Sequence, residues 1–192
     1  MKQSELAMYI ANKFLKADII QTDDAEVMAY YLENIMSMLT FIIPVTLMAV
    51  CTDMVWETGM YLAAFFIGRA CCGGYHAKTH LSCLLLSLGT YFLFLCLTQL
   101  YCQLGQPLFV IAGMVLISNI LIYFFAPADS ANKRFSKNEY LKYRKKSLLV
   151  LLFQNFLFLL VVFQIVEWTF FAAFFGVLQL AVSVGIAKMG YT

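Results

Sequence analysis

One cysteine and two histidines lie close together near the middle of the chain. Cys83 follows His80 by three residues and His76 by seven, and the sequence contains no other histidine. A thiol attacks carbonyl carbon as the thiolate, and a neighbouring imidazole can take its proton and later protonate a leaving amine. These residue types therefore predict a cysteine nucleophile with a histidine base.

Helix geometry separates the two candidate bases. In a continuous helix, His76 would lie about 10.5 Å along the axis from Cys83, too far for a hydrogen bond. His76 can act as the base only if the chain leaves the helix before Cys83, and Gly73-Gly74 permits such a reversal. His80 could reach Cys83 from the same helix, so spacing alone favours His80.

Other functions for these residues stay open. A zinc site could use the nearby cysteines and both histidines, but no Glu follows His76, so the HExxH pattern of metalloproteases is absent. Cysteine is also a small hydrophobe that packs in cores, and this is the preferred explanation for three others: Cys51, Cys96 and Cys102. Cys71 or Cys72 could instead carry a palmitoyl group.

The composition is that of a membrane protein. Hydrophobic residues make up 62% of the 192 residues, charged residues 12%, and the mean hydropathy is +0.81, whereas soluble domains carry about 25% charged residues. Six apolar runs approach the length of a spanning helix. They cover residues 35–52, 54–69, 81–102, 107–126, 147–166 and 168–187. The second is marginal, because Glu57 lies near its start and Arg69 ends it.

These runs predict an all-α protein with six transmembrane helices in one domain, residues 1–192. Residues 1–20 form an amphipathic pattern with lysines on one arc, which suits a helix lying on the membrane surface or, equally, one packed on protein. Asp23, Asp24, Glu26 and Glu33 then suggest a solvated connection. We thus expect an interfacial helix and connection over 1–33 and a transmembrane bundle over 34–188.

The distribution of charge predicts the orientation. With six crossings, all 13 Lys and Arg residues fall on one side of the membrane, together with both termini and the connections 70–80 and 127–146. Acidic Asp53, Glu57 and Glu167 fall on the other side. Because basic residues in short loops stay in the cytoplasm, we expect cytoplasmic termini and Cys83 near the cytoplasmic face.

Few polar side chains interrupt the predicted spans. Among them are the amides Asn119, Gln154, Asn155, Gln164 and Gln179. Amides inside a membrane usually bond to neighbouring helices, and we favour that interpretation over a lined substrate groove.

Two motifs make the sequence resemble AgrB, the membrane peptidase family of Gram-positive quorum-sensing systems. The first is Arg69, then Gly73-Gly74-Tyr75-His76-Ala77, then Cys83, with Ser87 one turn further. The second is Ala126-Pro127-Ala128-Asp129 followed by the basic pair Lys133-Arg134. The amphipathic start, the size and the order of the spans extend the resemblance over nearly the whole chain.

The resemblance implies a cysteine endopeptidase that cleaves the precursor AgrD near its C-terminus, without a metal or cofactor. It makes Cys83 the nucleophile and His76 the base, in place of His80. It also implies an acyl-enzyme thioester on Cys83, resolved by a cysteine or serine inside the substrate to give a thiolactone or lactone ring. Arg69, Gly73, Gly74 and Ser87 would support this site.

The resemblance also suggests the partners. An acidic precursor tail would suit the basic residues around the second motif: Lys133, Arg134, Lys137, Lys142, Arg144, Lys145 and Lys146. Anchoring the topology and attracting anionic lipid explain the same charges. A homodimer is compatible with a small bundle, although no span carries a persuasive GxxxG pattern, and no nucleic acid is expected. The rival interpretation is a membrane transporter or scaffold that binds an acidic peptide without cleaving it.

Overall fold

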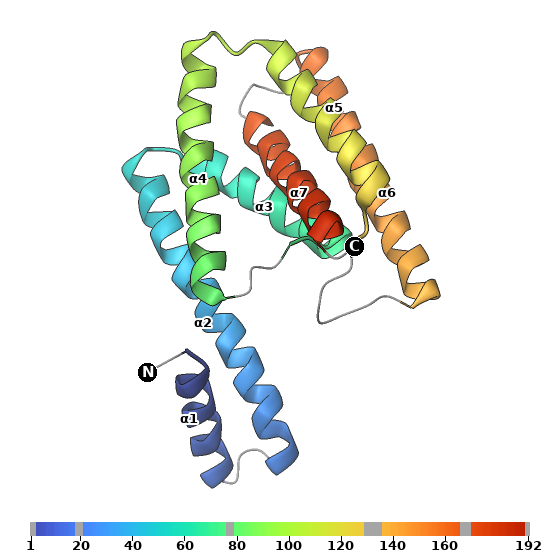
Figure 1. Ribbon diagram of the computed structural model, residues 1–192. Coiled ribbons are helices and arrows are strands. Elements are labelled where there is room, and N and C mark those ends of the chain that lie inside the picture. The colour runs from blue at the N-terminus through green and yellow to red at the C-terminus, as the bar shows by residue number, and fades with distance from the viewer. Residues whose placement is uncertain (1–2, 18–20, 76–78, 129–135, 166–169, 191–192) are drawn as a thin grey trace.

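The computed structural model describes residues 3–17, 21–75, 79–128, 136–165 and 170–190. The regular structure of these segments is entirely helical, which confirms the all-α class (Figure 1). The described helices are α1 (Gln3–Lys16), α2 (Thr22–Cys51), α3 (Val55–Cys72), α4 (His80–Gln103), α5 (Leu108–Phe125), α6 (Lys137–Val162) and α7 (Phe171–Gly190).

Five of the described helices are long and apolar enough to cross a membrane, namely α2, α4, α5, α6 and α7. The chain is therefore a multi-pass helical membrane protein. The marginal second span corresponds to α3, which has 18 residues but includes Glu57 and Arg69 and is not among the five. A count of six crossings stays a prediction.

The N-terminal region differs from the expected helix and solvated connection. Residues 22–51 form one continuous helix, so the acidic residues that suggested a loop lie on the first turns of α2. α1 folds back on this part of α2 through the buried side chains of Ala7, Ala11 and Ala29. Small side chains let the two backbones approach closely, and Figure 1 shows the resulting hairpin extending beyond the other helices. Contact of α1 with a bilayer remains a prediction.

The start of α6 also differs from the expected loop. We expected residues 127–146 to connect two spans, but α6 begins at Lys137, ten residues before the apolar run. A capping box explains this start: the Glu139 backbone N–H donates to Ser136 Oγ, and the Ser136 N–H donates to the Glu139 carboxylate. Most of the basic residues predicted to bind an acidic tail therefore lie on a helix.

The last helix, α7, is the centre of the bundle. It packs most extensively against α3 and α5, and Figure 1 shows it lying between α4 and α5. The close approach to α3 requires Gly176, because a Cβ there would lie 2.6 Å from the carbonyl oxygen of Tyr61. Aromatic rings from three helices fill the adjoining core, and Tyr61 stacks on Phe94 with ring centroids 4.5 Å apart.

The amides inside the bundle mostly bond to neighbouring helices, as predicted. Asn119 of α5 and Asn155 of α6 exchange two hydrogen bonds of 3.0 Å, and Gln179 bonds to α3 and α4. Gln154 differs, because its side chain is buried and neither amide atom has a hydrogen-bond partner among the described residues. Gln164 lies outside the spans, in the exposed turn after α6, where it adopts a φ of 55°.

Candidate active site

The chain leaves the helix before Cys83, as the geometric argument for His76 requires. α3 ends at Cys72, and Gly73 follows with φ 72° and ψ −153°, a region that is essentially restricted to glycine. Gly74 also has a positive φ, of 150°. The helix resumes at His80 after Thr79, whose Oγ1 accepts a hydrogen bond from the Ser82 N–H. Cys83 therefore lies in the first turn of α4.

The turn at Gly73 is held by the chain that follows α5. The Ala128 N–H donates a 3.0 Å hydrogen bond to the carbonyl of Cys72. The same residue packs so closely that a Cβ at position 73 would lie 2.5 Å from the Ala128 carbonyl oxygen. The second sequence motif thus contacts the first through the backbone, which explains why a glycine stands at position 73.

The next two residues are held by α7 and α3. The Tyr75 N–H donates to both the carbonyl oxygen and Oγ of Ser183, at 3.1 Å and 2.9 Å. The Tyr75 carbonyl accepts a 2.7 Å bond from Arg69 Nη2, and a Cβ on Gly74 would lie 2.8 Å from Ser183 Oγ. We call residues 73–75 with these partners the backbone clamp. It fixes the segment that leads directly to residue 76.

A cavity of about 110 Å³ lies beside the clamp and includes Cys83 in its wall. α4 contributes Cys83, Ser87 and Thr90, whose spacings of four and three residues place them on one helix face. The opposite walls come from α3 and α7, with Arg69 and Ser183 among their residues. The structure thus brings together Cys83, Arg69 and Ser87 in one cavity, and a Cβ on Gly74 would lie 3.7 Å from Arg69 Nη1.

Arg69 carries the positive charge of this cavity. Its guanidinium lies 5.7 Å from the ring centroid of Phe65, and Arg69 lines the same cavity as Cys83. The bond to Tyr75 fixes its orientation. A guanidinium has five N–H donors, so it can hold the clamp and also face an anionic group in the cavity.

The inner end of the cavity is closed by a chain of hydrogen bonds that joins three helices. The hydroxyl of Tyr61 donates to Gln179 Oε1, and Gln179 Nε2 donates to Thr90 Oγ1 at 2.8 Å. The Thr90 hydroxyl in turn donates to backbone carbonyls of its own helix. Sequence reasoning missed Thr90 and Ser183, since a single hydroxyl in an apolar helix gives no sign of what it faces.

Several predicted site residues lie outside the described residues. These are His76, Lys133 and Arg134, together with the side chain of His80. Among the described residues, no three His, Cys, Asp or Glu side chains are grouped so that they could hold a metal ion. The pairing of Cys83 with a histidine stays a prediction.

The basic residues of α6 have different surroundings. Arg144 donates to the carbonyl of Ala126 and lies 5.2 Å from the ring centroid of Tyr123, so it ties α6 to the end of α5. Three lysines are exposed on the same part of the helix: Lys137, Lys142 and Lys145. None of these four residues lines the Cys83 cavity.

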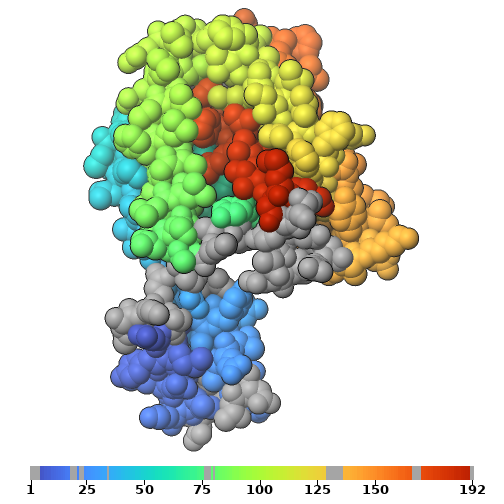
Figure 2. Space-filling model, in the orientation of Figure 1, coloured from blue at the N-terminus to red at the C-terminus, as the bar shows by residue number. Residues whose placement is uncertain are grey.

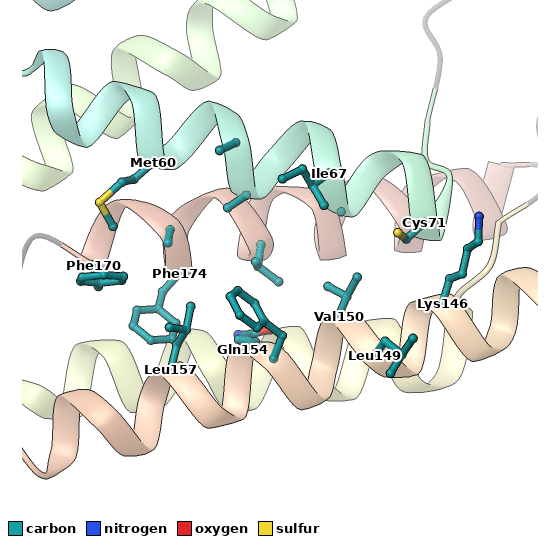
Figure 3. Close-up of a pocket in the computed structure, with 16 residues that line it drawn as sticks. Met60, Ile67, Cys71, Lys146, Leu149, Val150, Gln154, Leu157, Phe170 and Phe174 are labelled. Atoms are coloured by element: carbon teal, nitrogen blue, oxygen red, sulfur yellow. The ribbon is translucent and has the colours of Figure 1, made fainter. Parts of the chain in front are cut away.

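A larger groove of about 520 Å³ lies between α3, α6 and α7 and is almost entirely apolar. Figure 3 shows Met60 and Phe170 at one end and Lys146 at the other, with Gln154 on α6 between them. Cys71 lines this groove, whereas Cys83 does not. The groove and the Cys83 cavity share no lining residue, since they lie on different sides of the α3–α7 contact.

The comparison with protein families gives one match. The family described as Accessory gene regulator B, AgrB, matches residues 6–184, a range that includes every helix from α2 to α6 and the whole Cys83 cavity except Ile186. No curated protein and no solved structure matches the chain.

Proposed function

Because the chain belongs to the AgrB family, we propose that it is a membrane cysteine endopeptidase that cuts an AgrD-type precursor with Cys83. Membership itself places the protein in the accessory gene regulator quorum-sensing system, with an AgrD-type precursor as substrate. The proposal adds the catalytic type, the residues and the orientation.

The observation that carries the proposal is the position of Cys83. All six cysteines are free thiols. Of the six, Cys83 alone lines the cavity that also contains Arg69. A nucleophile needs room for a substrate carbonyl and a group that stabilises the negative charge developing on its oxygen. Arg69, fixed by the backbone clamp, can supply that charge stabilisation.

The proposed reaction has two steps. Cys83 Sγ attacks the scissile carbonyl, the C–N bond breaks, and His76 transfers the thiol proton to the leaving amine. A thiol or hydroxyl within the acyl part then attacks the thioester, which closes the ring and returns the proton to Cys83. Ring closure must outrun hydrolysis, and a small cavity between helices restricts water near the thioester.

The proposed orientation follows from where the basic helix ends lie. Arg69, Lys137 and Lys188 stand at the ends of α3, α6 and α7, and Figure 1 shows these ends on the same side of the bundle as the start of α4. We infer that this side faces the cytoplasm. The exposed lysines of α6 would then attract the acidic tail of the precursor, and anionic lipid as well.

The test is coexpression of the protein with its precursor and measurement of the cleaved fraction. Cys83→Ala should abolish cleavage while the protein still inserts into the membrane. Cys96→Ala is the matched control, because Cys96 lies on the same helix with an exposed side chain, and it should cleave normally. Cleavage by Cys83→Ala would contradict the proposed mechanism.

The rival, a peptide transporter or scaffold, makes a different prediction. It would bind the precursor equally well with and without Cys83 and would leave it intact. Thiol labelling distinguishes the two: a catalytic Cys83 should react with an electrophile faster than the other five cysteines. Near-normal cleavage by His80→Ala would assign the base to His76.

A further inference from the structure

We propose that the Cys83 cavity is a specificity pocket, which receives the side chain of the substrate residue whose carbonyl Cys83 attacks. This inference rests on the proposed function. It assigns Ser87, Thr90 and Gln179 to substrate selection, and it predicts a side chain of limited size on the acyl side of the cut.

The direction of the cavity supports this assignment. Cys83 stands in the first turn of α4, and Ser87 and Thr90 follow one and two turns further along the same face. The cavity therefore runs about 10 Å along the helix from the nucleophile. In the proposed binding mode, the attacked carbonyl carries its own side chain into this space, and the leaving peptide extends away from it.

The inner end of the cavity limits the length of the substrate side chain that can enter. Thr90 and Gln179 close it with a 2.8 Å hydrogen bond that links α4 to α7, and the Tyr61 hydroxyl holds Gln179 from the far side. Because all three groups are engaged with each other, they form a fixed floor. A side chain too long for the pocket would have to break this chain of hydrogen bonds.

The volume and the walls indicate the class of side chain. An engineered cavity of about 150 Å³ holds a benzene ring, so the 110 Å³ here suits a smaller group, of the size of Leu, Ile or Met. The walls between mouth and floor are apolar, from Phe65, Leu86 and Val182. Arg69 at the mouth would repel a Lys or Arg side chain that entered.

The pocket is open to the side as well as at the mouth. Figure 2 shows α7 exposed at the bottom of a hollow between α4 and α5. Val182 and Ile186 of α7 line the pocket and are 43% and 44% exposed. A peptide chain can therefore lie over α7 and insert one side chain, without first opening the helix bundle.

The experiment uses three precursors that carry Ala, Leu or Trp immediately before the cleaved bond, each coexpressed with the full-length protein. The wild-type protein should cleave the Leu precursor fastest. Ser87→Leu narrows the pocket and should lower cleavage of the Leu precursor about tenfold relative to the Ala precursor, since one methylene in a hydrophobic pocket changes rates by roughly 10–200-fold.

Two matched variants control for other effects. Ser87→Ala removes the same hydroxyl without narrowing the pocket, so an effect that appears in Ser87→Leu but not in Ser87→Ala comes from the smaller pocket and not from the lost hydroxyl. Leu85→Ala changes an exposed neighbour on α4 that does not line the pocket, and its rates should be those of the wild type. Leu86→Ala removes part of the wall and should improve cleavage of the Trp precursor relative to Leu.

The outcomes separate the pocket from the proposed function. Equal wild-type rates for the three precursors, or an equal loss for all three in Ser87→Leu, would overturn the pocket while Cys83-dependent cleavage stands. Cleavage that survives in Cys83→Ala would overturn the proposed function itself. If Ser87→Leu fails to accumulate in membranes, the wild-type preference and Leu86→Ala still decide the question.

Discussion

The substitution Gly73→Ala tests the backbone clamp most severely. Gly73 combines φ 72° with ψ −153°, and an L side chain in this region costs about 1–3 kcal/mol. The new Cβ would also lie 2.5 Å from the Ala128 carbonyl oxygen. Ala128 cannot move away without stretching its bond to the Cys72 carbonyl, and losing that bond costs about 0.5–1.5 kcal/mol.

The two costs together predict how far activity falls. Their sum, about 1.5–4.5 kcal/mol, corresponds to a factor of roughly 10 to 10³ in the population of the clamped conformation. If the clamp must be closed to place residue 76 near Cys83, cleavage of a coexpressed precursor should fall by at least about tenfold. The assay is the cleaved fraction over time, normalised to the amount of protein in the membrane.

Gly105→Ala is the matched control for Gly73→Ala. Gly105 also has a positive φ, of 76°, but apart from its chain neighbours no described residue comes within 4 Å of a Cβ at this position. It stands in the turn between α4 and α5, at the opposite end of α4 from Cys83. Its substitution should lower stability through backbone strain and leave cleavage unchanged. Wild-type cleavage by Gly73→Ala would refute the idea that the clamp positions the site.

Three further predictions concern the amides of the bundle and the guanidinium of Arg69. Gln154→Leu should raise the free energy of unfolding in detergent by about 1–3 kcal/mol, because it removes a buried amide that no described residue hydrogen-bonds. A loss of stability would contradict this. The single change Asn119→Leu should destabilise the protein more than the double change that also replaces Asn155 by Leu. The expected coupling energy between the two sites is about 0.6–1.7 kcal/mol, because the two amides exchange two hydrogen bonds. Additive effects on stability would contradict this pairing. Arg69→Lys should lower cleavage about 10²-fold, because the planar guanidinium can hold the Tyr75 carbonyl and also face the cavity, whereas an ammonium cannot do both. Full activity in Arg69→Lys would contradict the role proposed for Arg69.

Much of the fold follows from the sequence, and the exceptions have physical reasons. Apolar runs predicted the helices of the bundle because lipid permits few other spanning structures. The acidic residues on the first turns of α2 suggested a loop, yet residues 22–33 are helical, with α1 packed against this part of the helix. The early start of α6 was detectable in principle, since Ser136 and Glu139 have the spacing of a capping box.

The candidate site was only partly predictable. Motif spacing indicated Cys83 and Arg69, and the glycines indicated a break in the helix, because these are local properties of the chain. The contacts from Ala128 and Ser183 come from residues more than 50 and 100 positions away. Such contacts depend on how α5 and α7 pack, which hydropathy does not encode. Gln179 was recognised as a polar residue in a span, but not as the floor of a cavity.

The most direct test of the central claim is to trap the acyl-enzyme. The protein would be quenched with acid during turnover of its precursor, and its mass and peptides would be measured. We predict an adduct with the mass of the N-terminal precursor fragment, located on Cys83 and released by hydroxylamine, as a thioester would be. Cleavage of the precursor with Cys83 unmodified throughout turnover, or with the adduct on another residue, would contradict the account.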